Sequence, residues 1–166
     1  MRALCKIVLP IATTWANQQE ARMLRTGIPL TPAQLADAAA IGIAHPERVR
    51  LDIGPEAPWP FLKMFRPLAV RTGLVPRQIA GVTFRYGIFL RANHQHERGL
   101  LLHELAHTAQ YERLGGIRGF LAEYLYECLS SGYPNGPLEQ EASTMARAMI
   151  NVVSSIPEGC KEISRR

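Results

Sequence analysis

His103, Glu104 and His107 form the pattern His-Glu-x-x-His. Residues four apart lie on one face of an α-helix, so both imidazoles can direct a ring nitrogen at one metal ion. Glu104 lies about 100° around the helix from His103, where a carboxylate flanks the ion and can act as a general base on water. A chain of this composition contains the pattern by chance only about 0.01 times. The pattern therefore predicts a zinc site with His103 and His107 as ligands and Glu104 as the base.

The third protein ligand is not adjacent to this motif. A catalytic zinc site has three protein ligands and a fourth position for water. No third histidine follows His107 at the spacing H-x-x-G-x-x-H, in which a histidine ligand lies six residues further on. Cys128 and Cys160 have no neighbouring ligands, and an isolated buried cysteine usually serves as a small apolar residue. The cysteines are therefore weaker alternatives, and the best candidates for the third ligand lie on a later helix.

Two glutamates on one predicted helix are candidates for that ligand. Residues 137–142 read Pro-Leu-Glu-Gln-Glu-Ala. Around this helix, Glu141 lies about 60° from Leu138, at the border of an apolar stripe, whereas Glu139 lies about 100° away on the other side. A carboxylate beside a core stripe needs a cationic partner. We therefore predict Glu141 as the third ligand, with Glu139 or a surface role for Glu141 as alternatives.

The elements that must position these residues are predicted from hydrophobic periodicity and turn residues. Apolar positions on nearly every side predict a buried helix over residues 97–114, closed by Gly115 and Gly116. β-branched and aromatic residues around a glycine turn predict a preceding hairpin with strands 82–84 and 88–90. The same signals predict a strand over 49–53 and helices over 14–26, 32–41 (with Thr31 as N-cap), 61–71, 119–130 and 138–153.

Length and composition favour one globular domain over residues 1–166. The hydrophobic fraction of 47% and the charged fraction of 20% are ordinary for a soluble protein, and no run approaches the roughly 20 apolar residues of a membrane span. Residues 1–80 are predicted to be mainly helical, and residues 81–153 contain the hairpin and the helices of the site. The predicted fold class is α+β, mainly helical, with a small sheet before the motif helix.

Cysteine usage favours the cytoplasm. The three cysteines are far apart and unpaired in sequence, so no disulfide framework is predicted. Residues 1–12 loosely resemble a signal peptide, although Lys6 and Pro10 interrupt the apolar stretch. Secretion, by this segment or within a larger assembly, is the alternative.

The charge balance is basic, with a formal net charge of +5 and a pI near 9.4. The basic residues are scattered, and no cluster has the length of a nucleic-acid patch, so we expect no nucleic-acid partner. Binding to nucleic acid or to an anionic membrane surface is kept as an alternative function, which a steep salt dependence would reveal.

With these segments identified, the chain resembles the gluzincin branch of the zincin metallopeptidases. It looks most similar to small bacterial zincin-like domains that carry H-E-x-x-H-x-x-Q and P-L-E-x-E-A, here residues 103–110 and 137–142. The resemblance covers about residues 81–150. It implies a zinc peptidase with a His₂Glu site that acts on a peptide or protein substrate. It further implies that strand 88–90 borders the cleft and can pair with extended peptide, with an ordinary core hairpin as the alternative.

The resemblance leaves two parts of the site open. Larger family members place an aspartate four residues after the ligand glutamate, where it orients a histidine, but Met145 stands there in this chain. Another group must therefore orient the histidines. The donor for the developing oxyanion is also unassigned, with Tyr111, Tyr133, His94 and His96 as candidates. A catalytically silent zinc-binding scaffold or interaction domain is the alternative to a peptidase.

Overall fold

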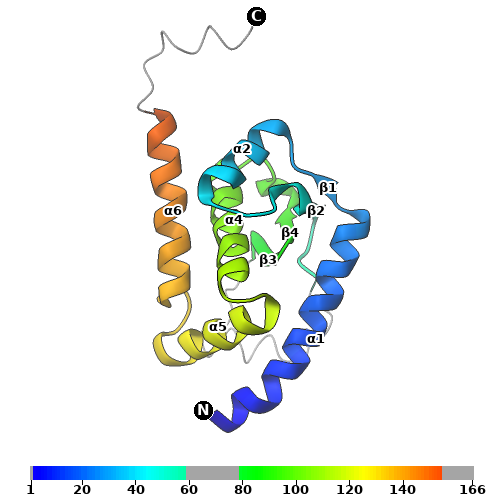
Figure 1. Ribbon diagram of the computed structural model, residues 1–166, viewed down its shortest axis with the longest axis vertical. Helices are drawn as coiled ribbons and strands as arrows, with labels where there is room; N and C mark the ends of the chain where they lie inside the picture. Colours follow the sequence, from blue (N-terminus) through cyan, green and yellow to red (C-terminus); the bar gives the residue numbers. More distant parts are fainter. Residues whose placement is uncertain (1, 59–78, 155–166) are drawn as a thin grey trace, which may run out of the picture.

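The computed structural model describes residues 2–58 and 79–154. This part of the chain is α+β and mainly helical, as predicted (Figure 1). The predicted helix over 61–71 and Cys160 lie outside the described residues. The helices are α1 (Arg2–Thr26), α2 (Pro32–Ile41), α4 (Arg98–Arg113), α5 (Ile117–Ser131) and α6 (Pro137–Ser154), and the strands are β1 (Ile28–Pro29), β2 (Arg50–Gly54), β3 (Gly81–Phe84) and β4 (Gly87–Arg91).

The N-terminal helices follow local sequence signals. Helix α1 ends before Gly27, as predicted, but begins well before the predicted start at residue 14. Helix α2 begins with the predicted cap, because the Thr31 side chain accepts from the backbone N–H of Gln34 and the Gln34 side chain accepts from the Thr31 N–H. This reciprocal arrangement satisfies two N–H groups that the first turn leaves without helical partners.

The four strands form one sheet in the order β1-β2-β4-β3. Strand β4 pairs in parallel with β2 and antiparallel with β3, so β4 is central and β3 lies at an edge of the described sheet. The predicted hairpin is confirmed, and Arg85 in its turn has a positive φ of 57°. Ile88, Phe89 and Leu90 are all buried, as expected of a central strand covered on both faces.

The motif helix α4 is the central helix of the described fold. It packs along α6 and against β3, and Figure 1 shows α4 (green) running beside α6 (orange). Leu102, Leu105 and Ala106 of α4 join Ala142 and Ala146 of α6 in the main hydrophobic core. The predicted stop is confirmed, because Gly115 and Gly116, which follow α4, adopt positive φ angles.

A second core cluster lies on the other side of β3. There α1 and α5 pack together, and Ala16, Phe84, Tyr111 and Phe120 are buried. This packing places α1 and α5 beside the histidine face of α4. Among the helices of the described ranges, none has both the length and the apolar character needed to cross a bilayer.

Candidate metal centre

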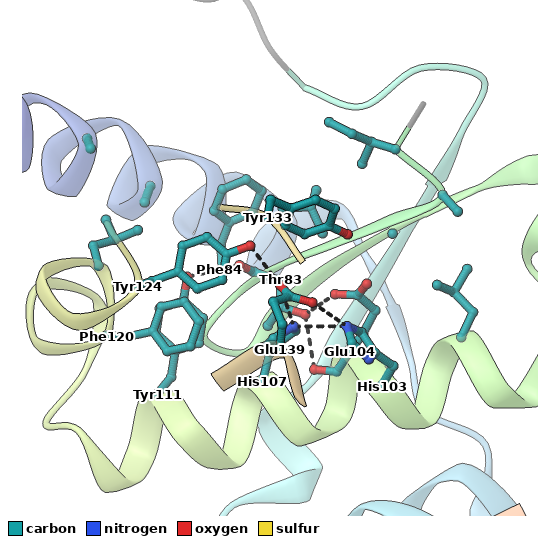
Figure 2. Close-up of a pocket in the computed structure, with 18 of the residues that line it drawn as sticks. Thr83, Phe84, His103, Glu104, His107, Tyr111, Phe120, Tyr124, Tyr133 and Glu139 are labelled. Atoms are coloured by element: carbon teal, nitrogen blue, oxygen red, sulfur yellow. Dashed lines mark hydrogen bonds and ion pairs between the residues drawn. The ribbon is translucent and has the colours of Figure 1, made fainter. Parts of the chain in front are cut away.

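Helix α4 directs both motif histidines into one pocket (Figure 2). The two Nε2 atoms of His103 and His107 lie 3.1 Å apart, as the four-residue spacing predicts. His107 is buried, and His103 is partly exposed. The site is therefore built into the core on one side and open on the other.

Glu139 from the first turn of α6 completes a three-residue cluster. Its Oε2 lies 3.4 Å from Nε2 of His103, and its Oε1 lies 3.5 Å from Nε2 of His107. One ligand atom from each of the three residues falls within 4.8 Å of the others. Two imidazoles and a carboxylate thus converge on a common point from two helices.

The spacing of these atoms fits a zinc ion. Zinc is bound at about 2.0–2.1 Å by imidazole and about 2.0–2.2 Å by carboxylate, and in a tetrahedral site such ligand atoms lie about 3.3 Å apart. The two Nε2 atoms lie 3.1 Å apart, and each lies 3.4–3.5 Å from a different oxygen of the Glu139 carboxylate. The donor set also matches the His₂Glu composition of catalytic zinc sites, in which one position stays open.

The predicted ligand Glu141 is elsewhere. Its carboxylate receives two hydrogen bonds from Arg113, at 2.6 and 2.7 Å, and a third from Nε2 of Gln110 at 3.0 Å. Glu141 is therefore directed away from the cluster, and the carboxylate that approaches the two histidines is that of Glu139 rather than that of Glu141, contrary to our expectation from the sequence.

Glu139 rather than Glu141 approaches the histidines because of the face of α6 that contacts α4. Ala142 and Ala146 are buried and lie on the Glu139 side of Leu138, whereas Met145, which lies on the Glu141 side, is only partly buried. Small side chains allow close approach of the two helices, so the contact is centred on the alanines rather than on the larger residues.

Each histidine contacts a polar side chain through its second nitrogen. Nδ1 of His107 lies 2.8 Å from Oε1 of Gln110, which is buried, and Nδ1 of His103 makes a long contact of 3.5 Å with the Ser143 hydroxyl. These contacts can orient the two histidine rings, which Met145 cannot do in place of the aspartate of larger family members. Gln110 was part of the recognised motif, but its contact with His107 was not predicted.

Hydrogen bonds to Glu139 hold it in the ionised form. Burial alone would raise the pKa of the Glu139 carboxyl, but hydrogen bonds with His103 and His107 outweigh burial and bring this pKa well below its usual value. The Tyr124 hydroxyl donates a further bond of 2.7 Å to Oε1. Burial and the charge of Glu139 raise the pKa of Tyr124, so this hydroxyl stays a donor.

The surrounding charges favour a cation at the cluster. Burial alone would lower the pKa of His107, but a hydrogen bond with Glu139 and the charge of Glu104 raise it above the ordinary value. The carboxylates thus stabilise positive charge at this point of the pocket. A bound metal cation would benefit from the same field.

Glu104 lies beside the cluster without joining it. Its Oε2 accepts a hydrogen bond of 2.6 Å from the Thr83 hydroxyl on β3. Gly81 faces the same carboxylate, and a Cβ atom there would lie 2.5 Å from Oε1 of Glu104. Burial raises the pKa of Glu104, against the opposing influence of His107, His103 and Thr83. Edge strand β3 therefore supports the predicted base, a role that the sequence did not predict for Thr83 or Gly81.

The cluster lies in a cavity of about 290 Å³. Residues 79–84 form one wall, and apolar and aromatic residues form the wall beside His107. Trp15 and Phe84 meet edge to face at 5.1 Å, and Phe120 stacks between the rings of Tyr111 and Tyr124. The strand lining the cavity is β3, whereas residues 88–90, which the resemblance placed there, are central and do not line it.

No protein-family model matches the chain, and no curated protein or solved structure is significantly similar to it. The chemistry of the described residues is therefore the basis for any functional conclusion.

The candidates for an oxyanion donor differ in position. The Tyr111 hydroxyl donates to the Thr83 carbonyl at 3.0 Å, and Nδ1 of His94 lies 2.7 Å from Glu97. His96 does not line the cavity. Tyr133 does line it, and Figure 2 shows its ring across the pocket from the motif helix. Burial and nearby carboxylates, including Glu139, raise the pKa of Tyr133 to about 12, so its hydroxyl is protonated at neutral pH.

Cys128 does not belong to the cluster. Burial raises the pKa of its thiol to about 11, so the metal-free thiol is protonated at neutral pH.

Proposed function

We propose that this protein is a zinc-dependent metallopeptidase of the zincin type, with His103, His107 and Glu139 as the metal ligands and Glu104 as the general base. The observation that carries the proposal is the convergence of two imidazole nitrogens and one carboxylate at 3.1–3.5 Å, with a second buried carboxylate beside them. A purely structural zinc site has no use for that second carboxylate.

Zinc, when bound, supplies a Lewis acid that polarises a carbonyl and lowers the pKa of water to about 7. Glu104 accepts the proton of the attacking water and passes it to the departing amine. Its raised pKa makes it a better proton acceptor than an exposed glutamate. The Thr83 hydroxyl holds one carboxylate oxygen and thereby orients the other.

The cavity supports a peptide as the substrate class. Edge strand β3 offers backbone groups that an extended peptide can pair with regardless of sequence. The apolar wall formed by Trp15, Phe84 and Phe120 suits an apolar side chain near the scissile bond. We therefore expect cleavage sites in which a large apolar residue flanks the hydrolysed bond.

Tyr133 is the proposed hydroxyl donor to the developing oxyanion. We expect Tyr133→Phe to lower kcat by up to about 100-fold, because one transition-state hydrogen bond is lost. Zinc content and KM should change little, since the ring remains. Tyr126→Phe, on the exposed face of α5, is the matched control. A rise in KM with an unchanged kcat would instead assign Tyr133 to substrate binding.

The proposed function is tested by metal analysis followed by cleavage profiling. The purified full chain should carry one zinc per molecule and should cleave a proteome-derived peptide library, with chelation abolishing cleavage and zinc restoring it. Zinc without any cleavage would favour the silent scaffold. Absence of stoichiometric transition metal after gentle purification would overturn the site itself.

A further inference from the structure

The amide of Gln110 has a single allowed orientation. Gln110 is almost completely buried, and its Nε2 donates to the carbonyl of Leu138 at 2.9 Å and to Oε2 of Glu141 at 3.0 Å. Both partners are oxygens that only accept hydrogen bonds. Rotating the amide by 180° would direct its own oxygen at these two acceptors. The carbonyl oxygen Oε1 must therefore face the other way, toward His107.

This orientation determines which nitrogen of His107 carries hydrogen. Oε1 of Gln110 lies 2.8 Å from Nδ1 of His107, and an amide oxygen can only accept. Nδ1 must therefore be the N–H donor. The protonated ring carries hydrogen on both nitrogens and can also donate from Nε2 to Glu139, whereas the neutral ring has one N–H, so its Nε2 retains a lone pair. That lone pair is directed toward His103 and Glu139, where the candidate metal site lies.

Glu141 is held in turn by Arg113. The guanidinium donates two parallel hydrogen bonds to the carboxylate, at 2.6 and 2.7 Å, which leaves Oε2 directed at Gln110. Both side chains are substantially exposed, at 55% for Arg113 and 36% for Glu141, and ion pairs in such positions contribute little to stability. The ion pair instead orients the Glu141 carboxylate. That carboxylate accepts from Nε2 of Gln110 and so determines which way the Gln110 amide faces.

We propose that Glu141, anchored by Arg113, is a positioning residue that acts through Gln110 to keep His107 in the Nδ1-protonated tautomer, with the Nε2 lone pair available to a metal ion. The proposal rests on the metal site of the proposed function but not on peptide hydrolysis. Glu141 is connected to Gln110 by one hydrogen bond and, through Gln110, to His107 by a second.

The first test is the histidine tautomer in the full-length chain. After metal removal by chelation, ¹⁵N chemical shifts of His107 are measured at a pH where the ring is neutral. We expect the Nδ1–H form in the wild-type chain and a mixture of tautomers in Gln110→Leu. A predominant Nε2–H form in the wild-type chain would overturn the proposal. This readout does not depend on activity, so a chain that fails to cleave peptides still tests it.

The second test is a double-mutant cycle on zinc affinity, measured by competition with a chromogenic chelator. Gln110→Leu should weaken zinc binding by about 10- to 100-fold, as expected for an outer partner of a ligating histidine. Glu141→Ala should weaken it measurably, by about threefold to tenfold, because the Leu138 carbonyl still holds the amide. The double variant should bind zinc no more weakly than Gln110→Leu, since Glu141 acts only through Gln110.

Two outcomes of the cycle contradict the proposal. Additive losses in the double variant would mean that Glu141 influences zinc independently of Gln110, for example as a direct ligand. No loss in Glu141→Ala would mean that the Leu138 carbonyl alone orients the amide. Glu123→Ala, an exposed carboxylate on α5, controls for charge removal. If Gln110→Leu does not fold, the wild-type tautomer and the tautomer in Glu141→Ala decide the matter.

Discussion

Glu104→Gln is expected to lower kcat for peptide hydrolysis by about 100- to 10,000-fold while zinc remains bound, because the amide cannot accept the proton of the attacking water. The change preserves the shape of the side chain, and its oxygen can still accept from the Thr83 hydroxyl. The measurement is steady-state hydrolysis of a peptide found by cleavage profiling, together with zinc content per chain. The zinc content should stay unchanged because Glu104 is not among the three clustered ligands.

Glu123→Gln is the matched control for this experiment, since it makes the same chemical change at an exposed position on α5. It should leave both kcat and zinc content unchanged. Full activity in Glu104→Gln would remove the proposed base from the mechanism. Loss of zinc in the same variant would instead assign Glu104 to metal binding.

Glu139→Gln is expected to weaken zinc binding more than 100-fold, beyond the 10- to 100-fold range of an outer-shell partner. The physical reason is the loss of an anionic ligand from a site otherwise made of two neutral imidazoles. The same variant should lose activity in proportion to its loss of zinc. The measurement is the zinc dissociation constant, obtained by chelator competition on the full chain.

Glu141→Gln is the informative comparison, because it makes the same change two residues away on α6. Its effect on zinc should be far smaller than that of Glu139→Gln, which is the opposite order to the one predicted from sequence. Circular dichroism of both variants checks that α6 stays helical. A larger loss of zinc in Glu141→Gln would restore Glu141 as the ligand and contradict the structural assignment.

Features set by local geometry could be predicted from the sequence. The pairing of His103 with His107 requires only that residues 98–113 be helical, because the four-residue spacing brings the two rings together in any α-helix. The position of Glu104 beside them follows from the same helix. The caps are equally local, since Thr31 begins α2 through contacts with its own first turn, and glycines end α4 through positive φ angles.

Features set by distant contacts required the tertiary structure. Glu139 rather than Glu141 meets the histidines because α6 approaches α4 through Ala142 and Ala146, and the apolar stripe of an isolated helix does not reveal which part of it will be the closest contact. Strand β3 rather than residues 88–90 lines the pocket because β2 pairs in parallel with β4 and makes it central.

The sequence by itself therefore determined the pairing of the two histidines, the glutamate beside them and the mainly helical α+β class, all of which follow from periodicity within single segments. Only the tertiary structure decided which carboxylate meets the histidines, which strand lies beside Glu104 and how hydrogen bonds connect Arg113 to His107. These depend on how separate segments pack against each other, and packing is decided by the shapes of many side chains at once.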